Sequence, residues 1–302
     1  MSVWVCGEAL IDVLVAGAVV GGGPANSAKA MARLGRSVEF IGGISTDDYG
    51  QQITEELHRD GVGLKLSLVS EKPTATAKVT LDEEGGASYL FTLDKTVTFD
   101  FSGSWLPDPS HLKIGVLHIG SLATIVEPGA QSLYEWAMKV AEFAPVVFDP
   151  NVRSTYLSDR TRYLESVERW ISISTVVKAS DDDIAWLHPD TEMVTVAKSW
   201  IQSGVEIVVI TRGENGLIAV TSDEIIEVPG FPVDVVDTVG AGDTVGAVIV
   251  DAILEYGIFN LRGEVLRKAL DCAGLAAAIT CSRAGAQPPT KMDLANRIEN
   301  RA

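Results

Sequence analysis

The segment with the clearest chemical potential lies at residues 237–244, which read Asp-Thr-Val-Gly-Ala-Gly-Asp-Thr and lead into an apolar stretch of helical period. Its small residues Gly240, Ala241 and Gly242 allow a tight turn, and amides at such a helix N-terminus bind phosphate or a developing oxyanion. Asp243 can face whatever those amides hold, and the positive end of the helix favours its ionised form. It could then accept a proton from a hydroxyl that attacks a phosphoryl group. Because the pattern is short, a helix-capping aspartate after a glycine-rich turn is the alternative.

A second glycine-rich segment, Gly-Gly-Gly-Pro-Ala-Asn-Ser-Ala at residues 21–28, leads into a predicted helix. Pro24 near the start of this helix and Gly35 after its end mark the boundaries. The glycines allow the backbone to approach a ligand closely, and Asn26 offers both a donor and an acceptor to hydroxyl groups. The segment is neither a P-loop nor a dinucleotide fingerprint. A plain glycine-rich loop before a helix of small residues is the alternative interpretation.

Polar residues also follow several predicted strands directly. Asp12 ends the first strand, and Arg153 lies in the segment Asp-Pro-Asn-Val-Arg at 149–153, after another strand. Two more clusters, residues 178–181 and 211–216, follow two further strands. Each alone has a simpler explanation, such as a turn or cap for Asp12 and a surface ion pair for Arg153. Because open α/β sheets bind ligands outside the carboxyl ends of their strands, the clusters together predict a site at one edge of a sheet.

The elements that must position these residues alternate along the chain. Short apolar, β-branched runs are followed by longer segments of helical period, which predicts an α/β fold with a mostly parallel central sheet and helices on both faces. The predicted strands are residues 3–6, 38–43, 114–120, 145–151, 174–180 and 207–213. The predicted helices are residues 24–34, 48–59, 128–143, 160–171, 194–202, 243–256, 263–281 and 291–300.

One stretch interrupts this alternation. The segments 74–82 and 87–94 flank Glu-Glu-Gly-Gly and alternate between polar and apolar residues, which predicts a β-hairpin. Inserted between α/β units, this hairpin is either a structural edge extension or part of a small β lid over a site. A second hairpin is predicted at residues 216–230. We expect residues 1–302 to form a single domain, with a small lid built from about residues 13–20 and 74–94.

The overall composition is that of a globular protein, with 46% hydrophobic and 22% charged residues. Lys and Arg number 24 against 41 Asp and Glu, so the formal net charge is −17. An acidic surface without a run of basic residues disfavours nucleic acid and anionic membranes as partners. No apolar run reaches the roughly 18 residues of a membrane span, and the N-terminus lacks a secretory pattern. Three cysteines without ligand spacing fit a reducing compartment, so we expect a cytoplasmic protein.

Taken together, these motifs resemble the ribokinase-like, or PfkB, family of carbohydrate kinases, and within it the bacterial fructokinases. The segments GGGPAN and DTVGAGDT are similar to its two signature regions, and VFDPNVR, KASDDD, TRGENG and SRAGAQPPT lie in order between and after them. The resemblance covers nearly the whole chain. It implies a three-layer ribokinase-like fold with a small β lid. It also implies an ATP-dependent kinase that phosphorylates a sugar hydroxyl, with Mg²⁺ and, as a further option, K⁺.

The resemblance implies roles for individual residues as well. Asp243 would be the general base, and Gly240, Ala241 and Gly242 would form the anion hole for the transferred phosphoryl group. The implied sugar-binding residues are Asp12, Gly21, Gly22, Asn26, Arg153 and Asp243, with Tyr89 and Phe91 from the lid. The implied nucleotide site comprises Lys178, Asp181, Thr211, Arg212, Gly213, Gly216, Gly240 and Gly242, of which Asp181 is linked to Mg²⁺ and phosphate. Asp237, Val239, Arg283 and Gly285 match positions around a monovalent cation, and the lid would support a homodimer.

The chain departs from the family pattern at Gly274, where many relatives carry a polar residue near the adenine, and in the segment after Asp12. Only residues 13–20 separate Asp12 from Gly21, where family members usually have a longer excursion, so either the lid is trimmed or a loop is missing. The absence of Lys and Arg from this segment favours an unphosphorylated sugar. Fructose is the first expectation, and 2-keto-3-deoxygluconate, ribose or a nucleoside are alternatives within the family. A catalytically silent sugar- or nucleotide-binding relative is the alternative from another class.

Overall fold

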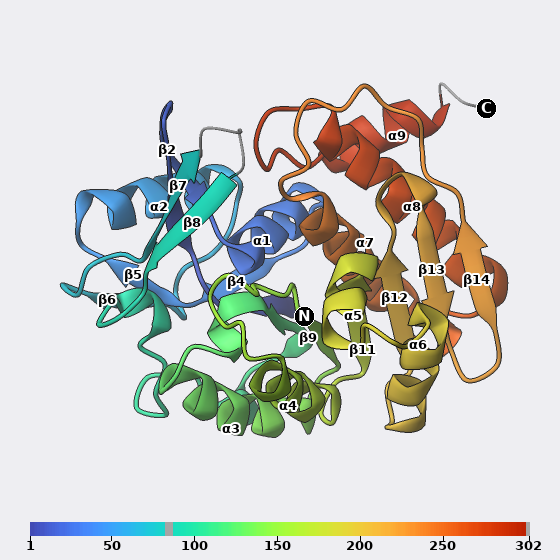
Figure 1. Cartoon of the computed structure of the whole chain (residues 1–302), viewed down its shortest axis with the longest axis horizontal. Helices are drawn as coiled ribbons and strands as arrows, with labels where there is room; N and C mark the ends of the chain where they lie inside the picture. Colours follow the sequence, from blue (N-terminus) through green and yellow to red (C-terminus); the bar gives the residue numbers. More distant parts are fainter. Residues whose placement is uncertain (82–86, 300–302) are drawn as a thin grey trace.

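A central sheet of eight strands runs through the part of the chain that the computed structural model describes, residues 1–81 and 87–299 (Figure 1). For residues 79–81, 87–89 and 299 only the backbone is described. The strand order is β14-β13-β12-β11-β10-β9-β1-β4. All neighbours from β4 to β12 pair in parallel, and β13 and β14 add an antiparallel edge. The strands are β1 Ser2–Cys6, β4 Val38–Ile41, β9 Ile114–Gly120, β10 Val146–Asp149, β11 Val176–Ser180, β12 Ile207–Thr211, β13 Leu217–Val220 and β14 Ile225–Val228.

The apolar strands of this sheet are buried on both faces, as expected for parallel strands covered by helices. Successive side chains of β1 alternate between two hydrophobic clusters: Val3 and Val5 pack on one side of the sheet, and Trp4 and Cys6 pack on the other. The ring of Trp4 stacks on Trp136, with a distance of 6.0 Å between the ring centroids. The core therefore lies in two layers, one on each face of the sheet.

Helices form the two outer layers. The face that carries Val3 and Val5 is covered by α1 Gly23–Arg33, α7 Ala241–Tyr256 and α8 Gly263–Cys281. The opposite face is covered by α3 Gly129–Ala141, α4 Arg160–Ile171, α5 Asp181–Leu187 and α6 Met193–Gln202. The remaining helices are α2 Asp48–Arg59 and α9 Lys291–Glu299. The predicted three-layer α/β fold is confirmed, and α5 is the helix that the sequence analysis missed.

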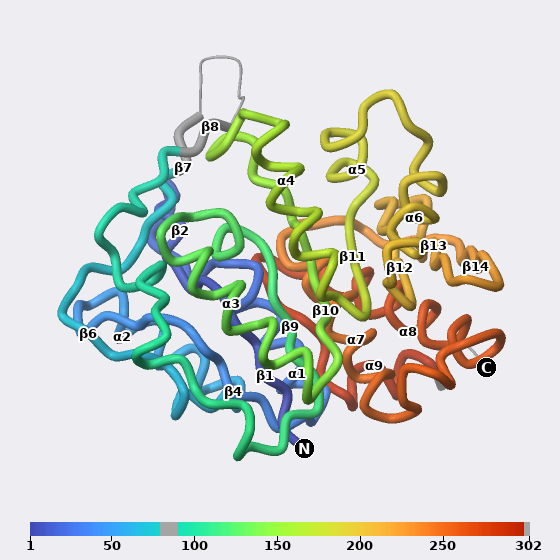
Figure 2. Tube along the Cα trace, turned by 90° about the horizontal axis from the view of Figure 1, so that it is seen from below, coloured from blue at the N-terminus to red at the C-terminus, as the bar shows by residue number. Residues whose placement is uncertain are grey.

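A second, smaller sheet has the order β3-β2-β7-β8 within the described residues and is built from the segments that were expected to form the lid. Its strands are β2 Leu10–Leu14, β3 Gly17–Gly21, β7 Thr76–Leu81 and β8 Ala87–Thr92. Figures 1 and 2 place it on the opposite side of the molecule from β14. A two-residue turn closes β2 onto β3, with Leu14 opposite Gly17, so the short segment after Asp12 forms a complete tight hairpin. A third, two-stranded sheet pairs β5 Gly43–Ser45 with β6 Leu68–Ser70.

The position predicted for Asp12 was wrong. Asp12 does not end the first strand of the central sheet, because that strand ends at Cys6. The chain turns at Gly7, whose φ is +151°, and Asp12 then lies in the middle of β2 in the small sheet. Apolar residues on both sides of Gly7 and Glu8 conceal this turn in the sequence, since Ala9, Leu10 and Ile11 remain buried after it.

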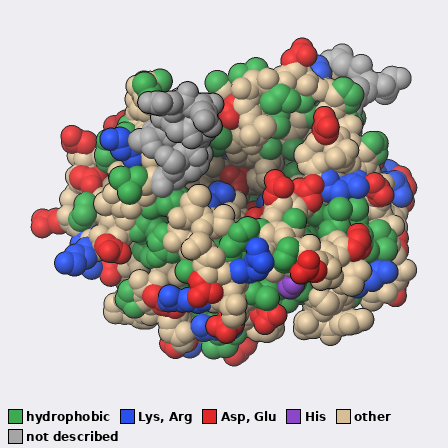
Figure 3. Space-filling view, viewed as in Figure 1, with side chains coloured by type: hydrophobic (Ala, Val, Ile, Leu, Met, Phe, Trp, Pro, Cys, Tyr) green, Lys and Arg blue, Asp and Glu red, His purple; other side chains and the backbone are tan. Residues whose placement is uncertain are grey.

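The surface agrees with the predicted charge pattern. On the face drawn in Figure 3, the Lys and Arg side chains of the described residues are scattered among acidic ones and form no continuous basic patch. None of the described helices is both long enough and apolar enough to cross a membrane.

Candidate active site

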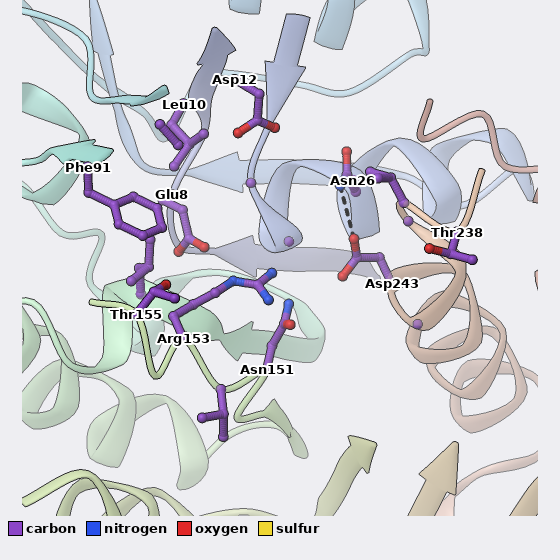
Figure 4. Close-up of a pocket in the computed structure, with 18 of the residues that line it drawn as sticks. Glu8, Leu10, Asp12, Asn26, Phe91, Asn151, Arg153, Thr155, Thr238 and Asp243 are labelled. Carbon is purple, nitrogen blue, oxygen red and sulfur yellow. Dashed lines mark hydrogen bonds between the residues drawn. The ribbon is translucent and has the colours of Figure 1, made fainter. Parts of the chain in front are cut away.

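A cavity of about 460 Å³ opens between the small sheet and the N-terminus of α7 (Figure 4). Its walls come from β2, from the start of α1, from the loop after β10 and from the turn before α7, which are far apart in the sequence. The predicted residues that line it are Asp12, Gly22, Asn26, Phe91, Arg153, Lys178, Val239, Gly240, Gly242 and Asp243. The sequence argument that the polar clusters converge is therefore correct for most of them.

Asp243 lies at the base of this cavity, in the first turn of α7. It is 8% exposed, and its Oδ2 accepts a hydrogen bond of 3.0 Å from Nδ2 of Asn26 on α1. The two helices pack directly against each other, which fixes this pair. The position at a helix N-terminus predicted a stably ionised carboxylate. In the structure burial raises the pKa of Asp243, although the charge of Lys178 and the hydrogen bond from Asn26 act to lower it. A carboxyl with a raised pKa binds a proton more readily than an exposed one.

The turn before α7 has the geometry of a helix N-terminus prepared for an anion. Gly240 adopts the left-handed conformation, with φ +81°, and a Cβ there would lie 2.8 Å from the Cβ of Ala286. The amide of Ala241 donates to the carbonyl of Thr238 and so closes the turn. The amides of Gly242 and Asp243 belong to the first helical turn, which has no carbonyl acceptors of its own. These two amides, rather than that of Ala241, can donate to a ligand.

Lys178 brings a buried positive charge to the same turn. Its Nζ is 2.6 Å from Oδ2 of Asp149, and both side chains are 5% exposed. Burial alone would lower the pKa of Lys178, but the neighbouring carboxylates of Asp149, Asp243 and Asp183 together outweigh burial and raise the pKa. A Cβ at Gly242 would lie 3.1 Å from Nζ, so the glycine allows the ammonium group to approach the turn. Lys178 was expected in the nucleotide site. In the structure it lines the first cavity, beside the turn before α7.

Arg153 and Asp12 face the cavity from opposite walls (Figure 4). Within the described part of the chain, the Arg153 guanidinium has no ion-pair partner. Burial raises the pKa of Asp12, while the charge of Arg153 opposes this. Gly21 does not line the cavity, but a Cβ there would lie 2.1 Å from Oδ2 of Asp12, so it makes room for that carboxylate. Phe91 lines the cavity, whereas the side chain of Tyr89 lies outside the described residues.

A second cavity, of about 520 Å³, adjoins the first and shares Thr238 and Gly242 with it. Its walls are mostly apolar and include Leu217, Phe231 and Val245. Of the residues expected at the nucleotide site, Thr211, Gly213, Gly216 and Gly242 line it. The side chain of Arg212 instead pairs with Glu227, and Asp181 lines neither cavity.

The residues expected around a monovalent cation are brought together in part. The Asp237 carboxylate accepts hydrogen bonds from the amides of Val239, at 3.0 Å, and Gly285, at 2.8 Å. This carboxylate therefore ties the turn before α7 to the loop after α8. Arg283 is directed to Asp293 and to the carbonyl of Pro288 instead.

Comparisons with known proteins decide the family. Residues 16–292 match the pfkB family carbohydrate kinase. The chain belongs to the PfkB family of carbohydrate kinases. A fructokinase of Rhizobium leguminosarum bv. trifolii is 32% identical over 266 residues, covering 85% of this chain and 81% of that protein.

Solved structures agree on the fold. A fructokinase from Xylella fastidiosa with bound ATP superposes with a TM-score of 0.89 at 24% identity, over 99% of this chain and 98% of that one. A fructokinase double mutant from Vibrio cholerae O395, in a form with fructose, ADP and potassium ion bound, gives a TM-score of 0.84 at 25% identity, over 97% and 95% of the two chains. The expected PfkB carbohydrate kinase, an ATP-dependent enzyme class, is therefore confirmed at the level of the family.

The polar residues of the first cavity that the sequence analysis of this PfkB-family kinase missed include Glu8 and Asn151. Glu8 follows β1 after a single glycine, so its position two residues beyond a strand was the available signal. Asn151 was part of a noted segment, but its φ of +39° and its approach to Gly23 could not be read from that pattern.

Proposed function

We propose that this PfkB-family enzyme transfers the γ-phosphate of ATP to a hydroxyl of an unphosphorylated sugar, with fructose as the first candidate. One observation carries the proposal: a polar cavity and an apolar cavity meet at Thr238 and Gly242, directly beside the buried carboxylate of Asp243. A small polyhydroxylated molecule suits the first cavity, and a nucleoside base and ribose suit the second. The junction is where a phosphoryl group would pass between them.

The proposed reaction needs one proton acceptor and a site for negative charge. Asp243 takes the proton from the attacking sugar hydroxyl, whose oxygen forms a bond to the γ-phosphorus. The bond from the γ-phosphorus to the bridging oxygen breaks, and ADP leaves. The amides of Gly242 and Asp243 and the ammonium group of Lys178 would stabilise the charge on the transferred group. Asn26 would hold the Asp243 carboxylate in position.

Mg²⁺ would neutralise the phosphate charge. This ion needs only one or two carboxylates beside phosphate oxygens and water. Oδ1 of Asp149 is buried and has no hydrogen-bond partner among the described residues. The other oxygen of this carboxylate, Oδ2, accepts the hydrogen bond from Lys178. Neither Asp149 nor Asp181 lines either cavity, but Asp149 has an unpartnered buried oxygen and is bonded to Lys178, which does line the first cavity. We therefore assign Asp149 as the better-placed carboxylate and leave Asp181 with a peripheral role.

A monovalent cation would belong to the loops that Asp237 joins. Carbonyl groups near Val239, Arg283 and Gly285 would hold K⁺, and the ion would then stabilise the turn that carries the Gly242 amide. The Vibrio cholerae fructokinase form with potassium ion bound supports this assignment.

Fructose is favoured among the sugars by the relatives. The Rhizobium protein is named a fructokinase, and the Vibrio cholerae enzyme was solved with fructose bound. Arg153 is the one described cation of the polar cavity that is not tied to a carboxylate, which disfavours a sugar phosphate. Ribose, 2-keto-3-deoxygluconate and nucleosides remain the alternatives within the family.

The test is ADP release with ATP, Mg²⁺ and K⁺ on a panel of sugars, sugar acids and nucleosides. We expect fructose to give the highest kcat/KM. Asp243→Asn should remove turnover. Asp251→Asn, at a half-buried position of the same helix where the carboxylate pairs with Arg36, should keep turnover within about twofold. A catalytically silent relative would show sugar- or ATP-induced rises in Tm without any ADP release, and this result would overturn the proposal.

We also propose that the small sheet acts as a lid and joins two copies of the chain. Three of its apolar side chains, Leu14, Val19 and Leu90, are 39%, 45% and 65% exposed. Light scattering after size-exclusion chromatography should give the mass of a dimer, and Leu90→Glu should shift it to a monomer. A monomeric mass for the parent protein at micromolar concentration would contradict the dimer.

A further inference from the structure

Glu8 is the most deeply buried charged residue of the polar cavity and has no part in the mechanism above. Its side chain is 1% exposed, yet it lines the cavity. Figure 4 shows the Glu8 carboxylate directed into the pocket, on the side of the Arg153 guanidinium. A buried carboxylate is costly unless its surroundings use it, so its presence at this position calls for a ligand or a structural partner.

The backbone holds Glu8 in place with little freedom. A Cβ at Gly22 would lie 2.6 Å from the Glu8 carbonyl oxygen, and one at Gly7 would lie 2.3 Å from Cγ of Pro24. The turn after β1 therefore packs tightly against the start of α1. Oε2 of Glu8 also accepts a hydrogen bond of 3.1 Å from the amide of Ala123. The Ser121 side chain and the backbone amide of Glu8 also act as hydrogen-bond donors toward this carboxylate. These donors use part of the capacity of a carboxylate, which can accept about four hydrogen bonds.

The charges around Glu8 decide which ligand it suits. The cavity is lined by three carboxylates, on Glu8, Asp12 and Asp243, and by two cations, on Arg153 and Lys178. Lys178 is already paired with Asp149 below the cavity. The charged groups of the cavity that are not paired with Asp149 are therefore three carboxylates and one guanidinium. Such a site accepts hydrogen bonds from neutral hydroxyls and repels a carboxylate on the ligand.

We infer that Glu8 is a substrate-binding residue that selects neutral sugars over sugar acids, by accepting hydroxyl hydrogen bonds and repelling a ligand carboxylate. The inference rests on the proposed sugar kinase function and narrows its substrate class. Burial raises the pKa of Glu8 to about 7, so the assays belong at pH 8, where the carboxylate is mainly ionised.

The decisive variant is Glu8→Gln. Glutamine keeps the size of the side chain and one oxygen that can accept from Ala123. It removes the charge and turns the second acceptor oxygen into an NH₂ donor. For the parent enzyme we expect kcat/KM for the best neutral sugar to exceed that for 2-keto-3-deoxygluconate or gluconate by at least 100-fold. Glu8→Gln should lower this ratio at least tenfold, mainly through KM. Glu206→Gln, which removes an acid paired with Arg262 far from the cavity, should leave the ratio unchanged.

Each outcome separates this inference from the proposed function. A ratio that stays within twofold in Glu8→Gln, or a parent enzyme that prefers the sugar acid, overturns the role of Glu8 while the kinase function stands. If no sugar is phosphorylated, the proposed function fails, and the same pairs of sugars are compared by their effect on Tm in parent and variant. If Glu8→Gln does not fold, Glu8→Asp withdraws the carboxylate by one methylene. A ratio reduced about threefold then supports the inference, and an unchanged ratio overturns it.

Discussion

Nδ2 of Asn26 donates a hydrogen bond of 3.0 Å to Oδ2 of Asp243, and the two residues are 217 positions apart in the chain. Oδ1 of Asn26 is buried and has no hydrogen-bond partner in the described part of the chain. The amide therefore orients the carboxylate with one end and keeps an acceptor for a ligand hydroxyl at the other. This arrangement joins the two glycine-rich segments into one site.

We expect Asp243→Asn to lower kcat for sugar phosphorylation by about 10³-fold or more, because general-base catalysis contributes roughly 10²–10⁴ and the variant also loses charge at the reacting atoms. Its thermal stability should stay close to that of the parent or rise, since burial already disfavours the ionised carboxylate. ADP release and a melting curve on the same sample test both statements. A folded variant with turnover near that of the parent would exclude Asp243 as the base.

Lys178→Met should destabilise the protein by about 3–5 kcal/mol, because it leaves the Asp149 carboxylate buried without its counter-charge. Adding Asp149→Leu should recover much of this loss, since a well-packed apolar pair can replace a buried ion pair. Urea unfolding of both variants measures the difference. Equal free energies of unfolding for the single and double variants would show that the buried Asp149 carboxylate does not need Lys178 as its counter-charge.

His118 on β9 should make the protein less stable in acid. Burial lowers the pKa of His118 to about 3, from an ordinary value of 6.5. Between these two values the unfolded chain binds a proton that the folded protein does not, so the free energy of unfolding falls as the pH falls. The contribution approaches about 1.4 kcal/mol per pH unit. In unfolding measurements from pH 6.5 to 4, His118→Leu should flatten the pH dependence, and parallel curves would contradict the assignment.

Gly274→Leu should raise the KM for ATP about tenfold while leaving the KM for the sugar unchanged. A Cβ at Gly274 would already lie 3.2 Å from the ring of Phe231, and both residues line the apolar cavity. A larger side chain must therefore displace the ring or fill part of the cavity. Steady-state kinetics with each substrate varied in turn is the test. An effect on the sugar KM alone would mean that the apolar cavity is not the nucleotide site.

The strands of the central sheet and the helices that cover it could be predicted because their buried residues form recognisable patterns in the sequence. Parallel strands buried on both faces read as continuous apolar runs, and helices such as Asp48–Arg59 begin and end at the expected residues. Helix α5 was missed because Asp181, Asp182 and Asp183 look like a ligand-binding cluster. In the structure Ser180 and Asp183 form a capping box that starts the helix, and Asp183 also accepts a bond from the Val152 amide.

Only those residues of the site that belong to short sequence motifs could be predicted. Asp243, Asn26 and the glycine turn carry such patterns, and they do come together. Glu8 carries only a weak signal, its position two residues after a strand, because a glutamate there is common and only three-dimensional packing places it in the cavity. The depth of burial that raises the pKa of Asp243 is likewise a property of packing, which the local helix terminus could not predict.

The packing of α1 on α7 also has a consequence for synthesis. The segment with Asn26 leaves the ribosome long before the codon for Asp243 is translated. The strands between these two residues can therefore form while the hydrogen-bonded pair of Asn26 and Asp243 is still incomplete. A nascent chain that stalls or is cleaved before α7 emerges lacks Asp243, the proposed general base. Under the proposed mechanism such products are inactive, and turnover during translation would appear only after α7 and α8 have both docked.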